Sequence, residues 1–268
     1  MDLQLAGKRA LVTGGSRGIG KAIGRQLALE GADVAIAART AGPLLEAADE
    51  LSRSSRRPVL GVPTDTRSET DVRQLVARVT EALGGGIDVL VNAAAQPGSA
   101  SGPPPGLADI NPEEFLDDIN VKVLGYLRCA REVVPSMLQA GWGRIINIGG
   151  MAARSSGNIV GSVRNCGVTS LGKNLADELA GSGVNVTTVH PGTTLTEGRR
   201  ARMQAKAEAT GKTVADLCRE FDVNNAIGRM VTPEEVADVV TFLASPRSVA
   251  INGDVVAAGG GAGRSIHQ

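Results

Sequence analysis

The 268-residue chain is electrically balanced, with 28 basic and 28 acidic side chains. A balanced surface gives no long-range attraction to nucleic acid or to an anionic membrane, so a small-molecule substrate is the expected partner. Three scattered cysteines indicate a reducing compartment and no metal site, and no apolar run reaches the roughly 18 residues of a membrane span. We therefore expect a cytoplasmic protein with one domain over residues 1–268, and with neither nucleic acid nor membrane as a partner.

The stretch from Arg9 to Glu30 has the pattern of a strand, a glycine-rich turn and a helix. Its glycines are spaced Gly-x-x-x-Gly-x-Gly and directly follow the apolar run Ala10–Val12. Glycines let backbone amides approach a ligand closely, and the start of a helix adds the positive end of its dipole. The stretch predicts an anion site, with a dinucleotide pyrophosphate as the expected anion. Its expected ligands are Gly14, Ser16, Arg17, Gly18, Ile19 and Gly20.

The second strand, expected at 33–38, ends where the ribose of a bound adenosine would lie. An NAD site usually has a carboxylate there, whereas this chain has Ala38 followed by Arg39. Arg17 in the glycine loop adds a second guanidinium group, and two such groups suit a 2′-phosphate. We therefore expect NADP(H) to be preferred over NAD(H). The alternative is that both arginines are solvated surface charges.

Strands and helices alternate along the rest of the chain. Strands are expected at 58–62, 87–91, 143–148, 184–189 and 254–257, and helices at 44–51, from Ser68, from Asn111 to about Leu138, at 161–179, and from Thr232 to Ala244. Residues 151–160 are expected to form a polar loop. The alternation predicts a single-domain α/β fold, a Rossmann-like doubly wound parallel sheet of about seven strands with helices on both faces. The charged segment 193–230 is expected to be a mobile cover for the substrate.

From about Leu5 to Gly261 the chain resembles the short-chain dehydrogenase/reductase family. The matching motifs are Thr13-Gly14-x-x-x-Gly18-x-Gly20, Asp65, Asn92 with Ala94, Asn120, Ile145–Ile148, Pro191-Gly192 with Thr196, and Thr232–Ala237. The resemblance implies the remaining cofactor contacts: Asp65 and Thr66 at the adenine, Asn92, Ala93 and Ala94 at the ribose, Asn165, and Pro191, Gly192 and Thr196 at the nicotinamide. It also implies a homo-oligomer, a dimer or tetramer paired through the helices at 111–138 and 161–179. Asp65 could instead simply cap a turn.

The resemblance breaks at the family's catalytic tetrad of Asn, Ser, Tyr and Lys. Alignment of the helix at 161–179 with the family's helix places Gly161 at the Tyr and Asn165 at the Lys, and a loop about two residues shorter places Gly150 at the Ser. Only Asn120 remains. The family's tyrosine neutralises the negative charge that hydride transfer puts on a carbonyl oxygen, and general acid catalysis of this kind is worth about 10² to 10⁴ in rate. The only tyrosine, Tyr126, lies mid-helix and is expected to pack.

Several residues are candidates for a replacement acid. Ser155 and Ser156 follow the fifth strand and could present a hydroxyl group, although loop serines are most often solvated. His190 ends the sixth strand and has a suitable pKa range, although a histidine there is more often structural. Arg154 and Arg164 could stabilise an oxyanion only as fixed cations. Lys122 follows Asn120 by two residues, so it is expected to face away from Asn120 on a helix.

Three functions fit this combination of an intact glycine loop with a changed tetrad. The first is an NADP(H)-dependent oxidoreductase with a non-standard active site. The second is a catalytically silent NADP(H)-binding subunit or sensor. The third is a lyase, dehydratase or isomerase that uses the same crevice without net redox change.

Overall fold

One parallel sheet of seven strands runs through residues 1–96, 104–222 and 225–263, the part of the chain that the computed structural model describes. The strands are β1 (Arg9–Thr13), β2 (Asp33–Ala38), β3 (Val59–Pro63), β4 (Val89–Asn92), β5 (Gly143–Ile148), β6 (Val184–Pro191) and β7 (Val255–Ala258). Their spatial order is β3-β2-β1-β4-β5-β6-β7, and every neighbouring pair is parallel. The predicted fold class is confirmed.

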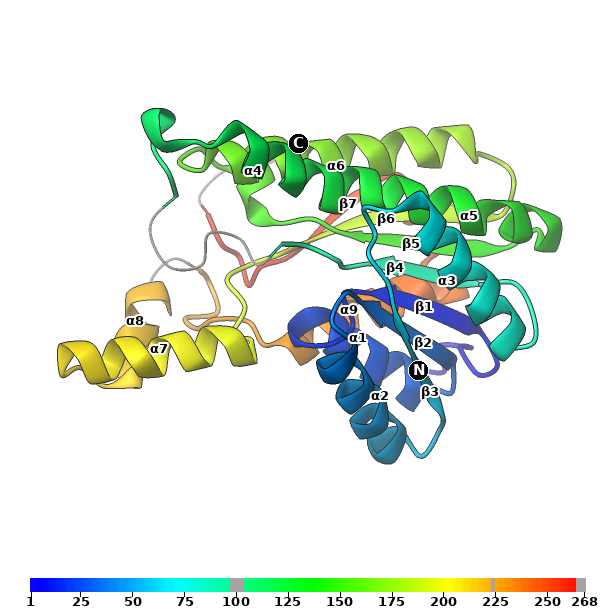
Figure 1. The fold of residues 1–268 in the computed structure, drawn as a ribbon, viewed down its shortest axis with the longest axis horizontal. Coiled ribbons are helices and arrows are strands. Elements are labelled where there is room, and N and C mark those ends of the chain that lie inside the picture. Colours follow the sequence, from blue (N-terminus) through cyan, green and yellow to red (C-terminus); the bar gives the residue numbers. More distant parts are fainter. Residues whose placement is uncertain (97–103, 223–224, 264–268) are drawn as a thin grey trace.

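Helices cover both faces of the sheet (Figure 1). They are α1 (Gly18–Leu29), α2 (Ala41–Ser55), α3 (Glu69–Ala82), α4 (Pro112–Ile119), α5 (Gly125–Ala140), α6 (Ile159–Glu178), α7 (Glu197–Thr210), α8 (Val214–Asp222) and α9 (Pro233–Ala244). On one face α1, α2 and α9 bury residues such as Ile23, Leu51 and Val240 against the sheet. On the other face α3, α5 and α6 bury residues such as Leu75 and Val133. The crossover order reverses beside β1, so β1 and β4 flank the expected ligand crevice.

Polar side chains cap the starts of five of the described α-helices. Ser68, Asn111 and Thr232 each accept a hydrogen bond from the backbone amide three residues ahead, as their sequence positions predict. The prediction for residues 151–160 is wrong in part, because Met151–Arg154 forms a 3-10 turn and α6 begins at Ile159. The reason is an unrecognised cap: the Asn158 side chain accepts a hydrogen bond of 2.8 Å from the Gly161 amide.

The segment 193–230 contains two helices, α7 and α8, that lie beyond the end of β6 (Figure 1). Thr196 caps α7, and Gly211 ends it in a left-handed conformation with φ of 66°. The two helices share a small core of Met203, Ala207, Leu217 and Met230. Residues 223 and 224 lie outside the described residues. That this segment covers a substrate, and that it moves, stay predictions.

Within the described residues, no helix is long and apolar enough to cross a membrane. Nor do those residues include a group of three or more His, Cys, Asp or Glu side chains that could hold a metal ion.

Candidate functional site

The glycine loop joins the end of β1 to the start of α1. A Cβ on Gly14 would lie 2.6 Å from the carbonyl oxygen of Ala93, and one on Gly20 would lie 2.3 Å from that of Gly14. Neither position therefore accepts a side chain, and both Gly14 and Gly18 have positive φ. Ile19 in the first turn of α1 packs partly against the core, and Ser16 is half-buried in the loop. The loop has the close backbone approach that the sequence predicts.

The first turn of α1 has no acidic residue, and its N-cap residue Arg17 makes no capping hydrogen bond. Instead, a carboxylate from another part of the chain supplies the acceptor: the Gly18 amide donates to Glu197 Oε2 at 3.0 Å. The start of α1 therefore binds an anionic group already, as expected from its exposed amides and dipole. Sequence reasoning did not find Glu197, since a contact across 179 residues leaves no local signal.

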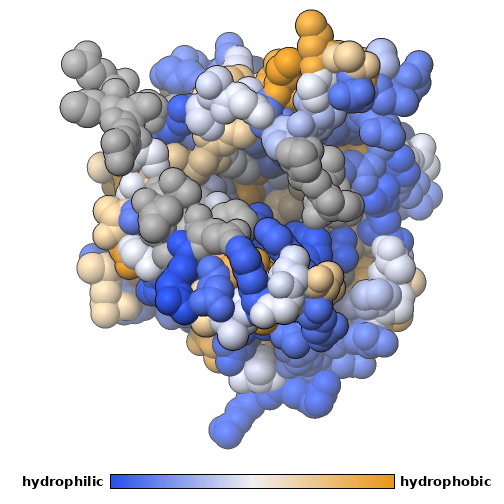
Figure 2. Space-filling view, turned by 90° about the vertical axis from the view of Figure 1, so that its left-hand side faces the viewer, coloured by the Kyte–Doolittle hydropathy of each residue, from blue (hydrophilic) through white to orange (hydrophobic). Residues whose placement is uncertain are grey.

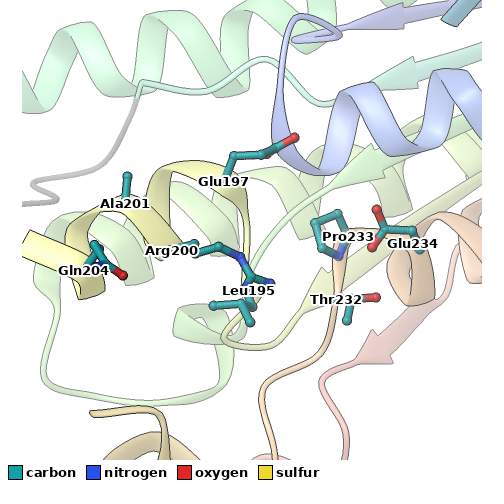
Figure 3. Close-up of a pocket in the computed structure, with 8 residues that line it drawn as sticks. All are labelled: Leu195, Glu197, Arg200, Ala201, Gln204, Thr232, Pro233 and Glu234. Atoms are coloured by element: carbon teal, nitrogen blue, oxygen red, sulfur yellow. The ribbon is translucent and has the colours of Figure 1, made fainter. Parts of the chain in front are cut away.

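Glu197 also lines a pocket of about 480 Å³ between α7 and the start of α9. Figure 3 shows Glu197 directed at the start of α1, and Arg200 directed toward Leu195. The remaining lining residues are Ala201, Gln204, Thr232, Pro233 and Glu234. Viewed from the side of α7 and α8, the surface is mostly hydrophilic with separate small apolar patches (Figure 2).

The two arginines expected at the 2′-phosphate are both exposed. Arg39 follows the end of β2, beside β1, and its Nη2 donates to Gln96 Oε1 at 3.1 Å. Arg17 stands in the glycine loop. Their exposed guanidinium groups are accessible to a ligand.

Asp65, one of the two residues expected at the adenine, forms an ion pair with Arg67. Asp65 accepts from Arg67 with both carboxylate oxygens, at 2.6 Å from Nη2 to Oδ2, and this bonding lowers the pKa of Asp65. Arg67 also reaches Asp117 at 3.1 Å. An adenine amino group would therefore have to share Asp65 with Arg67. Thr66 is buried beside Gly125 at the start of α5, and its carbonyl accepts from Arg128.

The ends of β1, β4 and β5 are joined by side chains. Thr13 Oγ1 accepts from the Ala93 and Ala94 amides at 3.2 and 3.3 Å. Asn92 is fully buried and donates to Asn147 Oδ1 at 3.0 Å across the β4–β5 register. These bonds hold the backbone of Ala93 and Ala94 beside Gly14, so the expected ribose residues and the glycine loop form one surface.

The end of β6 packs closely on the end of β7. The Gly192 amide donates to the Ala258 carbonyl at 3.1 Å, and a Cβ on Gly192 would lie 2.7 Å from Gly259 Cα. Pro191 is the last residue of β6. Thr196 accepts from the Arg199 amide, and its methyl carbon lies 3.2 Å from a Cβ built on Gly18. Of the expected nicotinamide residues, Thr196 therefore lies next to the glycine loop.

His190 is buried and uses both ring nitrogens. Nδ1 accepts from the Gly150 amide at 3.0 Å, and Nε2 lies 3.2 Å from Thr169 Oγ1. Burial, followed by the positive charges of Arg154 and Lys122, lowers the pKa of His190 to about 4. The ring is therefore neutral near pH 7, and this geometry favours a structural role in holding Gly150.

The other candidates are dispersed. Ser155 and Ser156 are exposed, and Ser155 Oγ donates to the Met151 carbonyl at 3.4 Å. The Asn120 side chain accepts from Arg128 Nη2 at 3.0 Å. Tyr126 is buried, and its hydroxyl donates to the Ile148 carbonyl at 3.1 Å. Burial raises the pKa of Tyr126, so this hydroxyl is a structural donor.

Lys122 is a residue that sequence reasoning did not place in the site. Its side chain does diverge from Asn120, but it points into the site, where Nζ donates to Gly149 O at 2.9 Å and to Asn165 Oδ1 at 3.0 Å. The backbone explains the direction, because residues 120–124 form a π-helical turn in which the Gly125 amide bonds to the Asn120 carbonyl. Such a wider turn redirects side chains relative to an α-helix, and spacing alone does not reveal it.

Positions 150 and 165 lie together. A Cβ on Gly150 would lie 3.0 Å from Asn165 Nδ2. Gly161 lies one turn before Asn165 on α6, where a Cβ would lie 2.7 Å from the capping Asn158 side chain. Beside them, Arg164 forms a largely buried ion pair of 2.5 Å with Asp118. The carboxyl end of β5 is therefore surrounded by the Lys122 ammonium group, the Asn165 amide, and two glycines that carry no side chain.

Comparison with known proteins identifies the family. The profile of the family described as short chain dehydrogenase matches residues 8–207. The chain belongs to this family. It is 34% identical to the uncharacterized oxidoreductase YvaG of Bacillus subtilis (strain 168), over 99% of this chain and 100% of that protein. It is 31% identical to the 3-oxoacyl-(acyl-carrier-protein) reductase FabG of Vibrio cholerae, over 97% of this chain and 98% of that protein.

A solved structure within the family closely resembles this one. L-sorbose reductase from Gluconobacter frateurii, in complex with NADPH and L-sorbose, superposes with a TM-score of 0.92 at 29% identity, over 99% of this chain and 100% of that chain. A variant of actinorhodin polyketide ketoreductase with NADPH superposes with a TM-score of 0.84 at 31% identity, over 94% of this chain and 96% of that chain.

Proposed function

We propose that this protein is an NADP(H)-dependent oxidoreductase with a non-standard active site. The observation that carries the proposal is the Gly18 amide, which already holds the Glu197 carboxylate at 3.0 Å. An anion therefore fits the start of α1, and the glycine cradle beside it admits no side chain at position 14. The two structural relatives described above are NADPH complexes, which supports the same cofactor here.

The residues present fit this cofactor. Gly14, Gly18 and Gly20 would hold the pyrophosphate, Arg17 and Arg39 the 2′-phosphate, and Pro191–Gly192 with Thr196 the nicotinamide end. When bound, the reduced nicotinamide supplies a hydride. The protein's own part is to orient the substrate, to exclude water and to stabilise the negative charge that develops on the substrate oxygen.

NADPH should bind more tightly than NADH, because two exposed guanidinium groups can meet the 2′-phosphate and no carboxylate stands at position 38. Calorimetric titration of wild type, Arg17→Ala, Arg39→Ala and the double variant measures this preference. The exposed Arg78 on α3 supplies a matched control, Arg78→Ala, which should change nothing. Equal affinities for NADH and NADPH in the wild type would contradict the arginine argument.

The silent binding subunit remains a second candidate, and one observation favours it. Gly150 and Gly161 present no side chain, and both nitrogens of His190 are engaged. This candidate predicts tight NADPH binding with no hydride transfer to any acceptor. The non-redox reading instead predicts turnover that leaves the bound nicotinamide reduced.

We also propose a homo-oligomer, paired through the helices at 111–138 and 161–179. Exposed apolar side chains on these helices support it, since Leu116 is 67%, Leu138 46% and Val163 49% exposed. Light scattering at micromolar concentration should give a dimeric or tetrameric mass. A monomeric mass would contradict the pairing.

A further inference from the structure

The side-chain amide of Asn165 is hydrogen-bonded through its oxygen but not through its nitrogen. The residue is 2% exposed, and its Oδ1 accepts from Lys122 Nζ at 3.0 Å. Nδ2 donates a hydrogen bond to no described residue, and it is not fully buried. Nδ2 is therefore a donor that remains open to a ligand.

Lys122 fixes which end of the amide faces the site. A charged ammonium group can only donate, so the oxygen of the amide must face Lys122 and the nitrogen must face away. The nitrogen then lies 3.0 Å from the place where a Cβ on Gly150 would stand. Since position 150 carries no side chain, nothing from that position covers the amide hydrogens.

The surroundings of Lys122 make its charge sensitive to pH. Burial, followed by the positive charge of Arg164, lowers the pKa of Lys122 to about 7, while Asp118 opposes the shift. Arg164 and Asp118 approach from α6 and α4 as an ion pair, and His190 of β6 is also influenced by the Lys122 charge. Tyr126 of α5 is buried nearby and stays protonated. The ammonium form, which orients and polarises the amide, is therefore lost as pH rises through about 7.

We propose, on the basis of the function proposed above, that Asn165 Nδ2 is the hydrogen-bond donor to the substrate oxygen and that Lys122 is its positioning residue. Hydride moves from the reduced nicotinamide to the substrate carbon, the carbonyl π-bond breaks, and its electron pair becomes an oxyanion held by Nδ2. A solvent proton then converts the oxyanion to a hydroxyl group, leaving the oxidised cofactor. A neutral amide donates no proton, so the site favours activated carbonyl compounds such as α-diketones, in which the second carbonyl withdraws charge and makes the alkoxide product a weaker base.

The test uses 4-nitrophenolate as a stable oxyanion, titrated into the protein saturated with NADP⁺ and followed by its absorbance. Wild type should bind the phenolate, and Asn165→Ala should bind it about tenfold more weakly, the value of one hydrogen bond to a charged acceptor. Lys122→Met should weaken binding similarly, and Lys122→Arg should restore part of it. Lys173→Met, on the exposed side of α6, is the matched control and should equal wild type.

A second measurement separates positioning from a merely structural role. In protein labelled with ¹⁵N, the Asn165 side-chain signals are assigned by their loss in Asn165→Asp. They should shift with pH through about 7 in wild type and should not shift in Lys122→Met. The affinity for NADP⁺ is measured on the same samples, so that every phenolate titration is run at full saturation with the cofactor.

The outcomes distinguish this inference from the proposed function. Failure of wild type to bind NADP(H) would overturn the proposed function and the inference with it. Cofactor binding without phenolate binding, or equal phenolate affinity in wild type and Asn165→Ala, would overturn the inference alone. If the Asn165 signals changed neither with pH nor in Lys122→Met, Lys122 would not be the positioning residue.

Discussion

Replacing Glu197 by Gln should tighten NADPH binding. Glu197 Oε2 lies 3.0 Å from the Gly18 amide, at the place proposed for the pyrophosphate. The cofactor must therefore displace the carboxylate, giving up a charge-assisted hydrogen bond of about 1.5–3 kcal/mol. Gln keeps the shape of Glu and can still accept from the amide, but it carries no charge.

Electrostatics sets the expected size of this effect. A carboxylate left about 5 Å from a unit negative charge, at an effective dielectric constant of about 20, is repelled by about 3 kcal/mol. Glu197 is exposed and can turn away, and salt screens such a pair, so most of this repulsion is relieved. We therefore expect a net gain of about 1.4 kcal/mol, which is about tenfold in affinity.

Calorimetric titration of NADPH into wild type, Glu197→Gln and Glu234→Gln measures this effect. Glu234 lines the same pocket, and no hydrogen bond joins it to Gly18, so Glu234→Gln controls for the overall change of charge. The difference in NADPH affinity between wild type and Glu197→Gln should become smaller as the salt concentration rises. Equal or weaker binding by Glu197→Gln, or an equal gain in Glu234→Gln, would refute the reasoning.

Three further predictions concern stability and the changed tetrad. The folded pKa of His190, about 4, lies below the unfolded value of about 6.5, so its contribution to stability is present above pH 6.5 and is lost as pH falls toward 4. The urea-unfolding free energy should drop by about 2 kcal/mol more between pH 7 and pH 5 in wild type than in His190→Gln, and equal drops would contradict this. Thr232→Ala should cost about 1–2 kcal/mol of unfolding free energy, because Thr232 and Glu235 form a reciprocal capping box; a change under about 0.3 kcal/mol would count against it. The triple variant Gly150→Ser, Gly161→Tyr, Asn165→Lys would put a second ammonium beside Lys122, so adding Lys122→Met should raise its NADPH-dependent ketone reduction. No gain over the triple variant would show that the two charges do not conflict.

The sequence predicted the sheet and most helix starts because these depend on local signals. Apolar runs marked the strands, and Ser68, Asn111 and Thr232 marked helix starts through side chains that reach only three residues ahead. The same logic could have found α7, since Thr196 caps it and Gly211 ends it. The low apolar content and many charges of that segment led only to an expectation of a mobile cover.

The parts of the site that the sequence did not reveal depend on long-range contacts. The direction of Lys122 follows from a π-helical turn, which has no spacing signature, and its partners lie 27 and 43 residues away. Glu197 meets Gly18 across 179 residues. No distance between Gly150 and Asn165 was predicted, because the alignment assigned each to a position of the family's tetrad without fixing how close they lie.

Single-turnover hydride transfer tests the proposed oxidoreductase activity most directly. Wild type saturated with NADPH is mixed rapidly with excess 9,10-phenanthrenequinone, and the loss of NADPH absorbance is followed. The control is Gly14→Val, whose Cβ would overlap the Ala93 carbonyl and so disrupt the glycine loop. The account predicts protein-dependent oxidation of the bound NADPH by wild type and only the background rate with Gly14→Val. If wild type also oxidised its bound NADPH only at the background rate, the result would contradict the proposed oxidoreductase and favour the silent binding subunit.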